Sequence, residues 1–284
     1  MLIDAHAHLN FNAYKKDVDE VIKRSLENNV WMINVGSQYE TSKKAVEIAQ
    51  KYEKGVYATI GLHPIHLNAG LVKIKLDKEE IAFNSREEEF NYEKYKELAK
   101  NEKVVAIGEI GLDYYYKLKT KRKLELFKEN QREVLVNQLN LAKELNLPVI
   151  FHCRMAHDDL IQTLQQSNIP TVKGVIHCFT GTWEQAEDYM RMGFYLGFNG
   201  IIFKKIEGID FEENIKNTPL NKILIETDCP YLTPLPAEAL AKAGRNEPLF
   251  VKYVAEKIAE IKKLSFEEIA KITTKNAQEL FKII

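Results

Sequence analysis

Eight short apolar runs, separated by segments with helical periodicity, constrain the fold of this chain more than any other feature. Most of these runs are continuously apolar, as expected for strands of a parallel sheet that is buried on both faces. Strand and helix patterns that alternate eight times favour a closed (β/α)8 barrel, the TIM barrel, over an open doubly wound sheet. The predicted strands cover residues 2–8, 30–35, 56–60, 104–109, 148–152, 174–177, 195–198 and 223–226.

The segments between and after these strands carry the helical patterns. Helices are predicted over residues 17–29, 41–53, 92–100, 120–145, 158–166, 182–192, 211–217 and 246–261. A last segment, 265–284, predicts one or two terminal helices, with Ser265 as N-cap and Glu268 at the capping-box position. We see no domain boundary, so residues 1–284 are expected to form one barrel domain with a C-terminal helical extension. Two long loops, 67–91 and 227–245, are expected to shape the substrate cleft at the carboxyl ends of the strands.

Composition excludes several classes of protein. A net charge of −1 excludes coating of nucleic acid by bulk charge, although a local basic patch remains open. No charged segment followed by an apolar one precedes the first strand, so no signal peptide is expected. No apolar run approaches 18 residues, so no transmembrane helix is expected. We therefore expect a cytoplasmic protein without membrane association, and a monomer.

The cysteines Cys153, Cys178 and Cys229 each follow a residue with metal-binding chemistry. Their odd number and the lack of a C-x-x-C spacing argue against a disulfide framework or a zinc ribbon. Because side chains alternate along a strand, these thiols should point away from the preceding side chains. We favour apolar packing over thiolate ligation for them.

Histidines and acids stand at the ends of successive predicted strands. His6 and His8 form an H-x-H pair at the end of the first strand, and residues two apart on a strand share a face. Four other strands lead to Glu109, His152, His177 and Asp228. The carboxyl ends of barrel strands meet at one face, where enzymes of this fold bind metal ions and substrates.

The order of these residues around the ring suggests two ions. Closure of the barrel brings Asp228 beside His6 and His8, which together form the first ligand group. His152 and His177 end neighbouring strands and can bind a second ion. Glu109 lies between the two groups, and its two oxygens can bridge cations about 3.5–4 Å apart. Such ligands suit Zn²⁺ or Mn²⁺, and Mg²⁺ is also open.

The motifs DAHAHLN, GLHP, GEIGLDYYY, PVIFHCR, GVIHCFTG, ETDCPYL and GRNEP occur in this order along the chain. Together they resemble the TatD family of metal-dependent deoxyribonucleases in the amidohydrolase superfamily, over nearly the whole chain. The resemblance implies a TIM barrel, a divalent-metal site and hydrolysis of DNA phosphodiesters. It also implies that the six residues above are the ligands, and that His63 is an active-site histidine that binds no metal.

The chain departs from the family pattern at four places. Met155 replaces an acid that follows C-R in many relatives, and in His63-Pro64-Ile65-His66 the second histidine is shifted by one. The basic stretch before R-N-E-P is reduced to residues 241–244, and the 67–91 loop is longer than usual. None of the four changes replaces an implied metal ligand. They concern the preference for substrate instead.

Phosphodiester cleavage suggests further roles. Asp228 can accept the proton of the attacking water, and Glu109 supports the ions. His63 can bind a phosphate oxygen or protonate the leaving oxygen; the alternative is a structural histidine.

Other residues are candidates for contacting the substrate. Arg154 suits a bidentate phosphate contact, and a salt bridge to a surface acid is the equal alternative. Of Tyr114, Tyr115 and Tyr116, at least one is expected to pack inward and another, with Tyr114 the candidate, to stack on an unpaired base. Glu226 can orient a ligand.

Three functions remain open at this stage. The first is a TatD-like exonuclease that trims single-stranded or frayed DNA ends. The second is an amidohydrolase acting on a carbonyl bond, such as an aminoacyl-RNA ester, a lactone or an amide, because fold does not fix the substrate. The phosphotriesterase-like branch usually carries a modified lysine where Glu109 stands, which favours the nuclease. The third, a metal-binding protein without activity, is disfavoured by the complete ligand set.

Overall fold

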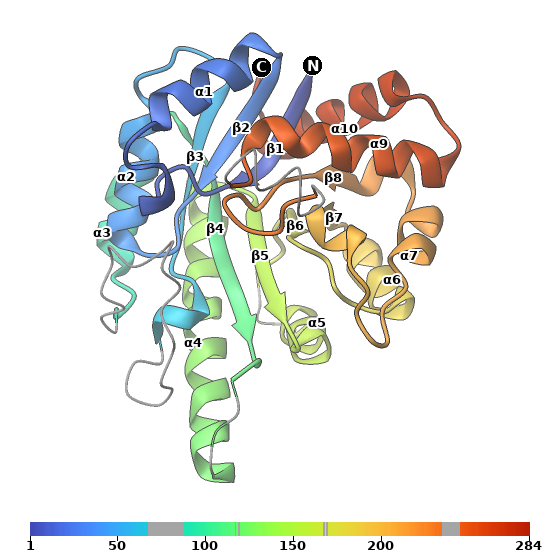
Figure 1. The fold of residues 1–284 in the computed structure, drawn as a ribbon. Helices are drawn as coiled ribbons and strands as arrows, with labels where there is room; N and C mark the ends of the chain where they lie inside the picture. The colour runs from blue at the N-terminus through green and yellow to red at the C-terminus, as the bar shows by residue number, and fades with distance from the viewer. Residues whose placement is uncertain (68–87, 117, 119, 167, 169, 235–244) are drawn as a thin grey trace.

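Eight parallel strands form one curved sheet in the order β1 to β8, and helices surround it (Figure 1). The structure is a computed structural model that describes residues 1–67, 88–116, 118, 120–166, 168, 170–234 and 245–284. The strands are β1 (Leu2–Ala7), β2 (Val30–Val35), β3 (Val56–Ile60), β4 (Val104–Asp113), β5 (Val149–Arg154), β6 (Gly174–Ile176), β7 (Tyr195–Phe198) and β8 (Ile223–Ile225). The predicted TIM barrel is confirmed.

The α-helices follow the strands as the alternation predicts. They are α1 (Val18–Glu27), α2 (Tyr39–Ala49), α3 (Tyr92–Leu98), α4 (Lys121–Leu145), α5 (His157–Gln165), α6 (Trp183–Arg191), α7 (Phe211–Asn217), α9 (Val251–Lys262) and α10 (Phe266–Phe281). None of the helices in the described ranges is both long enough and apolar enough to cross a membrane. The predicted loops 67–91 and 227–245 lie largely outside the described residues.

Capping side chains in the local sequence explain where helices α4 and α10 begin. The Thr120 hydroxyl accepts a hydrogen bond from the backbone N–H of Lys123 at the start of α4. Ser265 and Glu268 form the predicted capping box of α10, in which each side chain accepts a hydrogen bond from the other residue's backbone N–H. These side chains satisfy N–H groups that have no partner within the helix.

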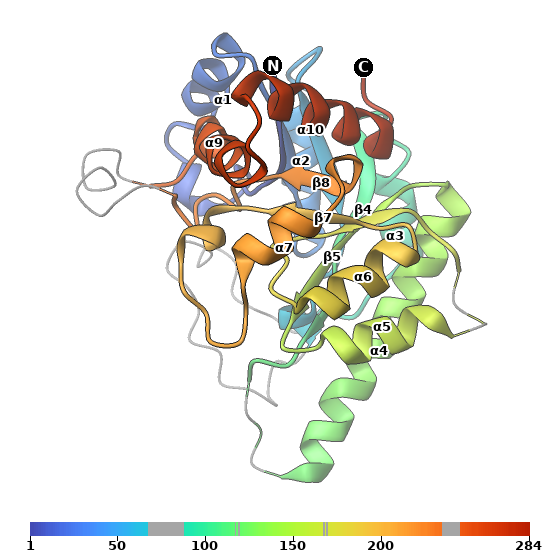
Figure 2. The same ribbon diagram turned by 90° about the vertical axis from the view of Figure 1, so that its right-hand side faces the viewer.

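Two groups of buried side chains make up the core. The larger group lies between the strands and the surrounding helices. The second joins side chains of β1, β2, β4, β5, β6 and β8 to Ala277, Leu280, Phe281 and Ile283 at the end of the chain. Figures 1 and 2 show α10 across the end of the sheet at which the strands begin. The helical extension therefore covers one end of the barrel and leaves the carboxyl ends of the strands for a site.

Closure between the first and last strands depends on a buried carboxylate. Asp4 in β1 accepts hydrogen bonds from the backbone N–H (2.8 Å) and the hydroxyl (2.5 Å) of Thr227, just after β8. Two backbone bonds, from Asp228 N to His6 O and from His8 N to Cys229 O, complete the junction. Burial outweighs these hydrogen bonds and raises the pKa of Asp4 to about 8.

Strand β4 is longer than predicted. The prediction ended it at Glu109, whereas residues 110–113 continue to pair with residues 151–154 of β5. The G-L-D sequence after Ile110 resembles a turn, but Gly111 adopts a φ of +151° within the strand. An added Cβ at Gly111 would collide with the carbonyl oxygen of His152. Glycine therefore permits the close pairing that carries β4 up to Asp113.

Helix α9 begins later than the predicted residue 246. Asn246 instead donates hydrogen bonds to the carbonyl oxygens of Thr227 and Tyr231, and Glu247 pairs with Arg24 of α1. A 3-10 turn, Pro248–Phe250, precedes the helix. These long-range contacts hold residues 246 and 247 in an extended connection, and the periodicity of the sequence alone does not show them.

We expect Gly111→Ala to lower the free energy of unfolding by more than about 3 kcal/mol, because both the backbone angle and the contact with β5 oppose it. Gly193→Ala is the matched control. It has a φ of +95° and no atom within 4 Å of the added Cβ, so about 1 kcal/mol is expected. Urea unfolding monitored by circular dichroism measures both losses, and equal losses would contradict the proposed role of close packing.

Candidate metal centre

All six residues predicted as ligands lie together at the carboxyl ends of the strands. They are His6 in β1, His8 just after it, Glu109 in β4, His152 in β5, His177 after β6 and Asp228 after β8. His6, His8, Glu109 and His177 are buried, and the other two are half-buried. Within the described part of the chain, three groups bring ligand atoms close enough to hold an ion: His6–His8–Asp228, His6–His177–Glu226 and His63–Glu109–His152.

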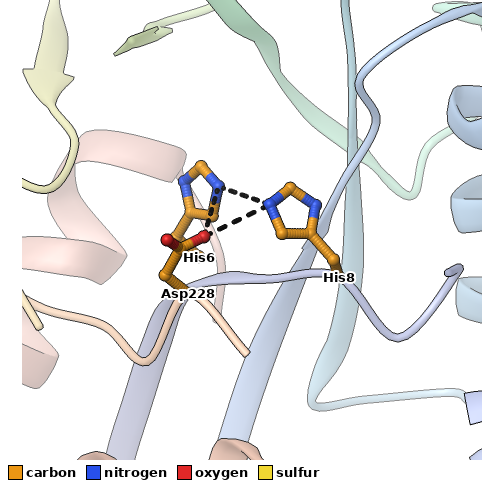
Figure 3. Close-up of side chains that lie close together, drawn as sticks. All are labelled: His6, His8 and Asp228. Atoms are coloured by element: carbon orange, nitrogen blue, oxygen red, sulfur yellow. Dashed lines mark hydrogen bonds and ion pairs between the residues drawn. The ribbon is translucent and has the colours of Figure 1, made fainter. Parts of the chain in front are cut away.

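The first group has the geometry that a cation requires (Figure 3). The Nε2 atoms of His6 and His8 are 3.1 Å apart, and Asp228 Oδ1 lies 3.8 Å from the first and 3.4 Å from the second. Ligand atoms about 2.1 Å from one ion lie roughly 3.0–3.4 Å from one another. The His6–His8 and His8–Asp228 separations lie in this range and the His6–Asp228 separation exceeds it, so a small side-chain movement would let the three hold one divalent cation.

The orientation of the His8 ring and the neutral state of the His6 ring suit metal binding. Nδ1 of His8 lies 3.0 Å from the carbonyl oxygen of Val35, to which it can only donate. Asp228 and Glu109 outweigh burial and raise the pKa of His8, and a cation would replace the proton on its Nε2, which faces the shared space. Burial, with the nearby His177, lowers the pKa of His6 to about 4, so the His6 ring is neutral and available as a ligand.

His177 stacks on His6, with ring centroids 3.5 Å apart, and is oriented by Glu226. Its Nδ1 lies 2.8 Å from Glu226 Oε1, which also accepts hydrogen bonds from Cys178 N (2.7 Å) and Asn199 Nδ2 (3.2 Å). Nε2 of His177 consequently faces Asp228 and Glu109, at 3.8 and 4.0 Å. A carboxylate behind a histidine is the usual support of a metal ligand, as the sequence predicts for Glu226.

Glu109 lies at the centre of the cluster. Its carboxylate oxygens are 2.7 Å from His152 Nδ1, 3.4 Å from His6 Nε2 and 3.9 Å from His8 Nε2. Burial alone would raise the pKa of Glu109, but His63, His6 and His152 together lower it well below its usual value. The carboxylate is therefore ionised and borders both predicted ligand groups. That His152 and His177 share one ion stays a prediction.

His63 is the remaining histidine of the cluster and is held in one tautomer. Its Nδ1 accepts a hydrogen bond from the backbone N–H of Ile65, at 3.0 Å. The ring proton of neutral His63 is therefore on Nε2, which lies 3.5 Å from Glu109 Oε1. Burial, with the nearby His152, lowers the pKa of His63 and favours this neutral form. The arrangement suits a hydrogen-bond donor better than a metal ligand.

Asp113 belongs to the site although sequence analysis gave it no role. Its Oδ2 lies 3.2 Å from His152 Nε2, and its Oδ1 accepts the backbone N–H of Tyr115 at 2.9 Å. Contacts with Asp113 and Glu109 outweigh burial and raise the pKa of His152 to about 9. Asp113 follows Glu109 by four residues, so extending the predicted strand past Glu109 would have placed it in the site.

The two residues predicted to bind substrate differ in their surroundings. Arg154 is exposed at the end of β5, with its guanidinium carbon 3.6 Å from the ring centroid of Tyr115. Tyr114 is half-buried against Phe127 of α4, and Lys128 Nζ lies 4.6 Å from its ring centroid. Substrate binding by Arg154 and Tyr114 stays a prediction.

Two of the three cysteines are buried, and the third contacts a polar side chain. Cys153 and Cys229 are buried with free thiols, and Cys178 is half-buried with Sγ 3.6 Å from Asn199 Oδ1. Among the described residues, no group that can hold an ion includes a cysteine.

Comparison with known proteins relates this site to a family. The family model described as TatD related DNase matches residues 3–282. The metal-dependent hydrolase YabD of Bacillus subtilis is 43% identical over 100% of both chains. The 3'-5' ssDNA/RNA exonuclease TatD of Pantoea vagans is 32% identical over 99% of this chain and 100% of its own length.

A solved structure agrees with these relatives. That of YjjV, a TatD homologue from Escherichia coli, has a TM-score of 0.79 and 28% identity, and the match covers 100% of this chain and 98% of that one. These relatives do not favour hydrolysis of a carbonyl bond. The matches extend over nearly the whole sequence, the barrel and the candidate ligands included, and this chain belongs to the TatD-related DNase family of metal-dependent hydrolases.

Proposed function

We propose that the protein is an exonuclease that shortens single-stranded or frayed DNA by hydrolysing phosphodiester bonds. One observation carries the proposal: the Nε2 atoms of His6 and His8 and a carboxylate oxygen of Asp228 face one another at 3.1–3.8 Å, beside an ionised Glu109. Relatives that match over their whole length are named as 3'-5' exonucleases of single-stranded DNA and RNA, which supports this substrate class.

We propose two divalent ions as cofactors, Zn²⁺, Mn²⁺ or Mg²⁺. His6, His8 and Asp228 would hold the first ion, His152 and His177 the second, and Glu109 would contact both. When bound, such ions supply Lewis-acid stabilisation of a phosphate and lower the pKa of water. The mixture of imidazole and carboxylate ligands supports a first-row transition metal, and the carboxylates leave Mg²⁺ open.

The side chains supply the remaining chemistry. Asp228 is ionised, because His177, His6 and His8 outweigh burial and lower its pKa, so it can accept the proton of the attacking water. His63 presents an N–H at Nε2, which can donate to a phosphate oxygen or to the leaving oxygen. Arg154 adds a fixed positive charge at the rim.

The remaining expectations are part of the same proposal. We propose that residues 1–284 act as one domain, that the protein is a monomer, and that it acts in the cytoplasm. One core group joins Ile3 of β1 to Ile283, which follows α10, and this supports the first of these.

The first test is cleavage of end-labelled single-stranded DNA by protein stripped of metal and refilled with Mg²⁺, Mn²⁺ or Zn²⁺. We expect metal-dependent shortening, and the labelled end gives the polarity. Glu109→Ala should reduce the rate at least about a hundredfold, because it removes the carboxylate between the ligand groups. Metal-loaded protein that leaves every oligonucleotide intact would exclude the nuclease.

Measurement of the metal content distinguishes a histidine that binds an ion, His8, from one that contacts only the substrate, His63. His8→Ala should lose one ion per chain after dialysis, because His8 is a ligand. His63→Ala should retain the full content yet lose about a hundredfold in rate, because its N–H acts on the substrate. Elemental analysis beside the cleavage assay measures both, and loss of metal in His63→Ala would instead make His63 a ligand.

Glu226→Gln tests the support behind His177. It should weaken the affinity for Mn²⁺ tenfold to a hundredfold, because a neutral amide fixes the ring less firmly. Glu247→Gln is the matched control: Glu247 is also buried, but pairs with Arg24 of α1 rather than with a histidine. Titration of metal-free protein compares the two, and equal affinities would contradict the role of Glu226.

A further inference from the structure

An aromatic side chain remains half exposed beside the metal centre. Tyr115 follows β4 and is 50% exposed, unlike the other large aromatic residues at this end of β4, Tyr114 and Phe127. The guanidinium of Arg154 lies against one face of its ring, at 3.6 Å from the centroid. Tyr116 approaches at 5.5 Å in an edge-on arrangement. Tyr115 and Arg154 therefore form a two-layer stack at the rim of the site.

The charge of Arg154 is not neutralised by an acid in the described part of the chain. The ion pairs found there leave Arg154 without a carboxylate partner, whereas nearby Arg132 pairs with Asp159. Stacking on an aromatic face leaves the in-plane N–H groups of a guanidinium available for other partners. Of the alternatives raised by the sequence, the salt bridge to a surface acid is therefore not observed among the described residues.

Hydrogen bonds and strand pairing connect the Tyr115–Arg154 stack to the candidate metal centre. Arg154 lies two residues after His152 on β5 and pairs in register with Asp113 of β4. Asp113 contacts His152 Nε2 with one oxygen and accepts the backbone N–H of Tyr115 with the other. The buried carboxylate of Asp113 thus positions both the predicted ligand His152 and the backbone of Tyr115.

We propose that Tyr115 and Arg154 form a subsite that stacks on an unpaired nucleobase next to the phosphodiester being cleaved. This inference rests on the proposed nuclease function and identifies residues that select its substrate. Every base has a π-face that can stack on an aromatic ring or on a guanidinium plane, so the contact tolerates any sequence. A base inside a duplex has its faces covered by its neighbours, so the subsite favours single strands and frayed ends.

The surroundings of the stack agree with this occupant. Met155, which replaces the acid common in relatives, is 68% exposed next to Arg154 and adds apolar surface without negative charge. Tyr114 is less suited, because Phe127, Lys128 and Arg132 surround its ring and hydroxyl. The base-stacking role predicted for Tyr114 is therefore reassigned to Tyr115 in this proposal.

Steady-state kinetics of the metal-loaded protein test the subsite. With a single-stranded oligonucleotide, we expect Tyr115→Ala and Arg154→Ala each to lower kcat/KM roughly tenfold, mainly through KM, as loss of one base stack would. Tyr115→Phe should match the wild type, since it keeps the ring. Because the two side chains act as one stack, the double variant should lose much less than the product of the single losses.

Two controls separate stacking from general damage. An oligomer of abasic deoxyribose phosphates carries no aromatic ring, so its hydrolysis should be equal in wild type and Tyr115→Ala. Tyr57 lies at the start of β3, near Lys103 and at the opposite end of the barrel from the site. Tyr57→Ala should therefore leave oligonucleotide cleavage unchanged.

Abasic substrates give the decisive readout. We place an abasic nucleotide at each of the three positions from the cleaved end in turn. The wild type should slow roughly tenfold at one position, and Tyr115→Ala should lose that dependence. Equal abasic effects in both proteins, or an equal loss on the fully abasic oligomer, would overturn the subsite while the nuclease stands. Wild type that cleaves no oligonucleotide would overturn the proposed function and the subsite together.

Discussion

Burial of negative charge at the mouth of the barrel is the constraint on which the rest of the site depends. Glu109, Asp113, Glu226 and Asp228 are held there with little access to water. Removing a carboxylate from water costs on the order of several kcal/mol unless a partner compensates it. The histidines supply that compensation, and a second contact orients several of the rings: Val35 O for His8, Ile65 N for His63 and Glu226 for His177.

The barrel gives this network its rigidity. The ligands come from five strands or the residues that follow them, so each is fixed by a different part of the sheet. Asp4 and Thr227 hold the junction between the first and last strands, two residues before His6 and one before Asp228. The interactions that close the barrel and those that would bind an ion are therefore neighbours along the chain. A substitution that weakens the Asp4–Thr227 junction is therefore expected to shift His6 and Asp228 as well.

Much of this arrangement is readable in the sequence, since buried parallel strands are continuous apolar runs and the ligands mark their ends. The parts that are not readable depend on contacts between distant segments. The extension of β4 needs the close approach of Gly111 to His152, and Asp113 joins the site only because of it. The tautomer of His63 is set by a backbone N–H in the turn that follows it.

The three consecutive tyrosines show the same limit. Alternation predicts that they face different ways, but not which one stays exposed. Phe127 and Lys128 of α4 pack around Tyr114, whereas Tyr115 is exposed.

The position of α10 also affects the order in which parts of the structure can form during synthesis. Its side chains Ala277, Leu280 and Phe281 pack with Ile3 and Ala5 of β1 in one cluster. During synthesis this core group is therefore completed only after residues 277–283 have been made. The first ligand group has a similar requirement, because Asp228 joins His6 and His8 only after β8 exists. A growing chain could therefore assemble His63, Glu109 and His152 earlier than the group that includes Asp228.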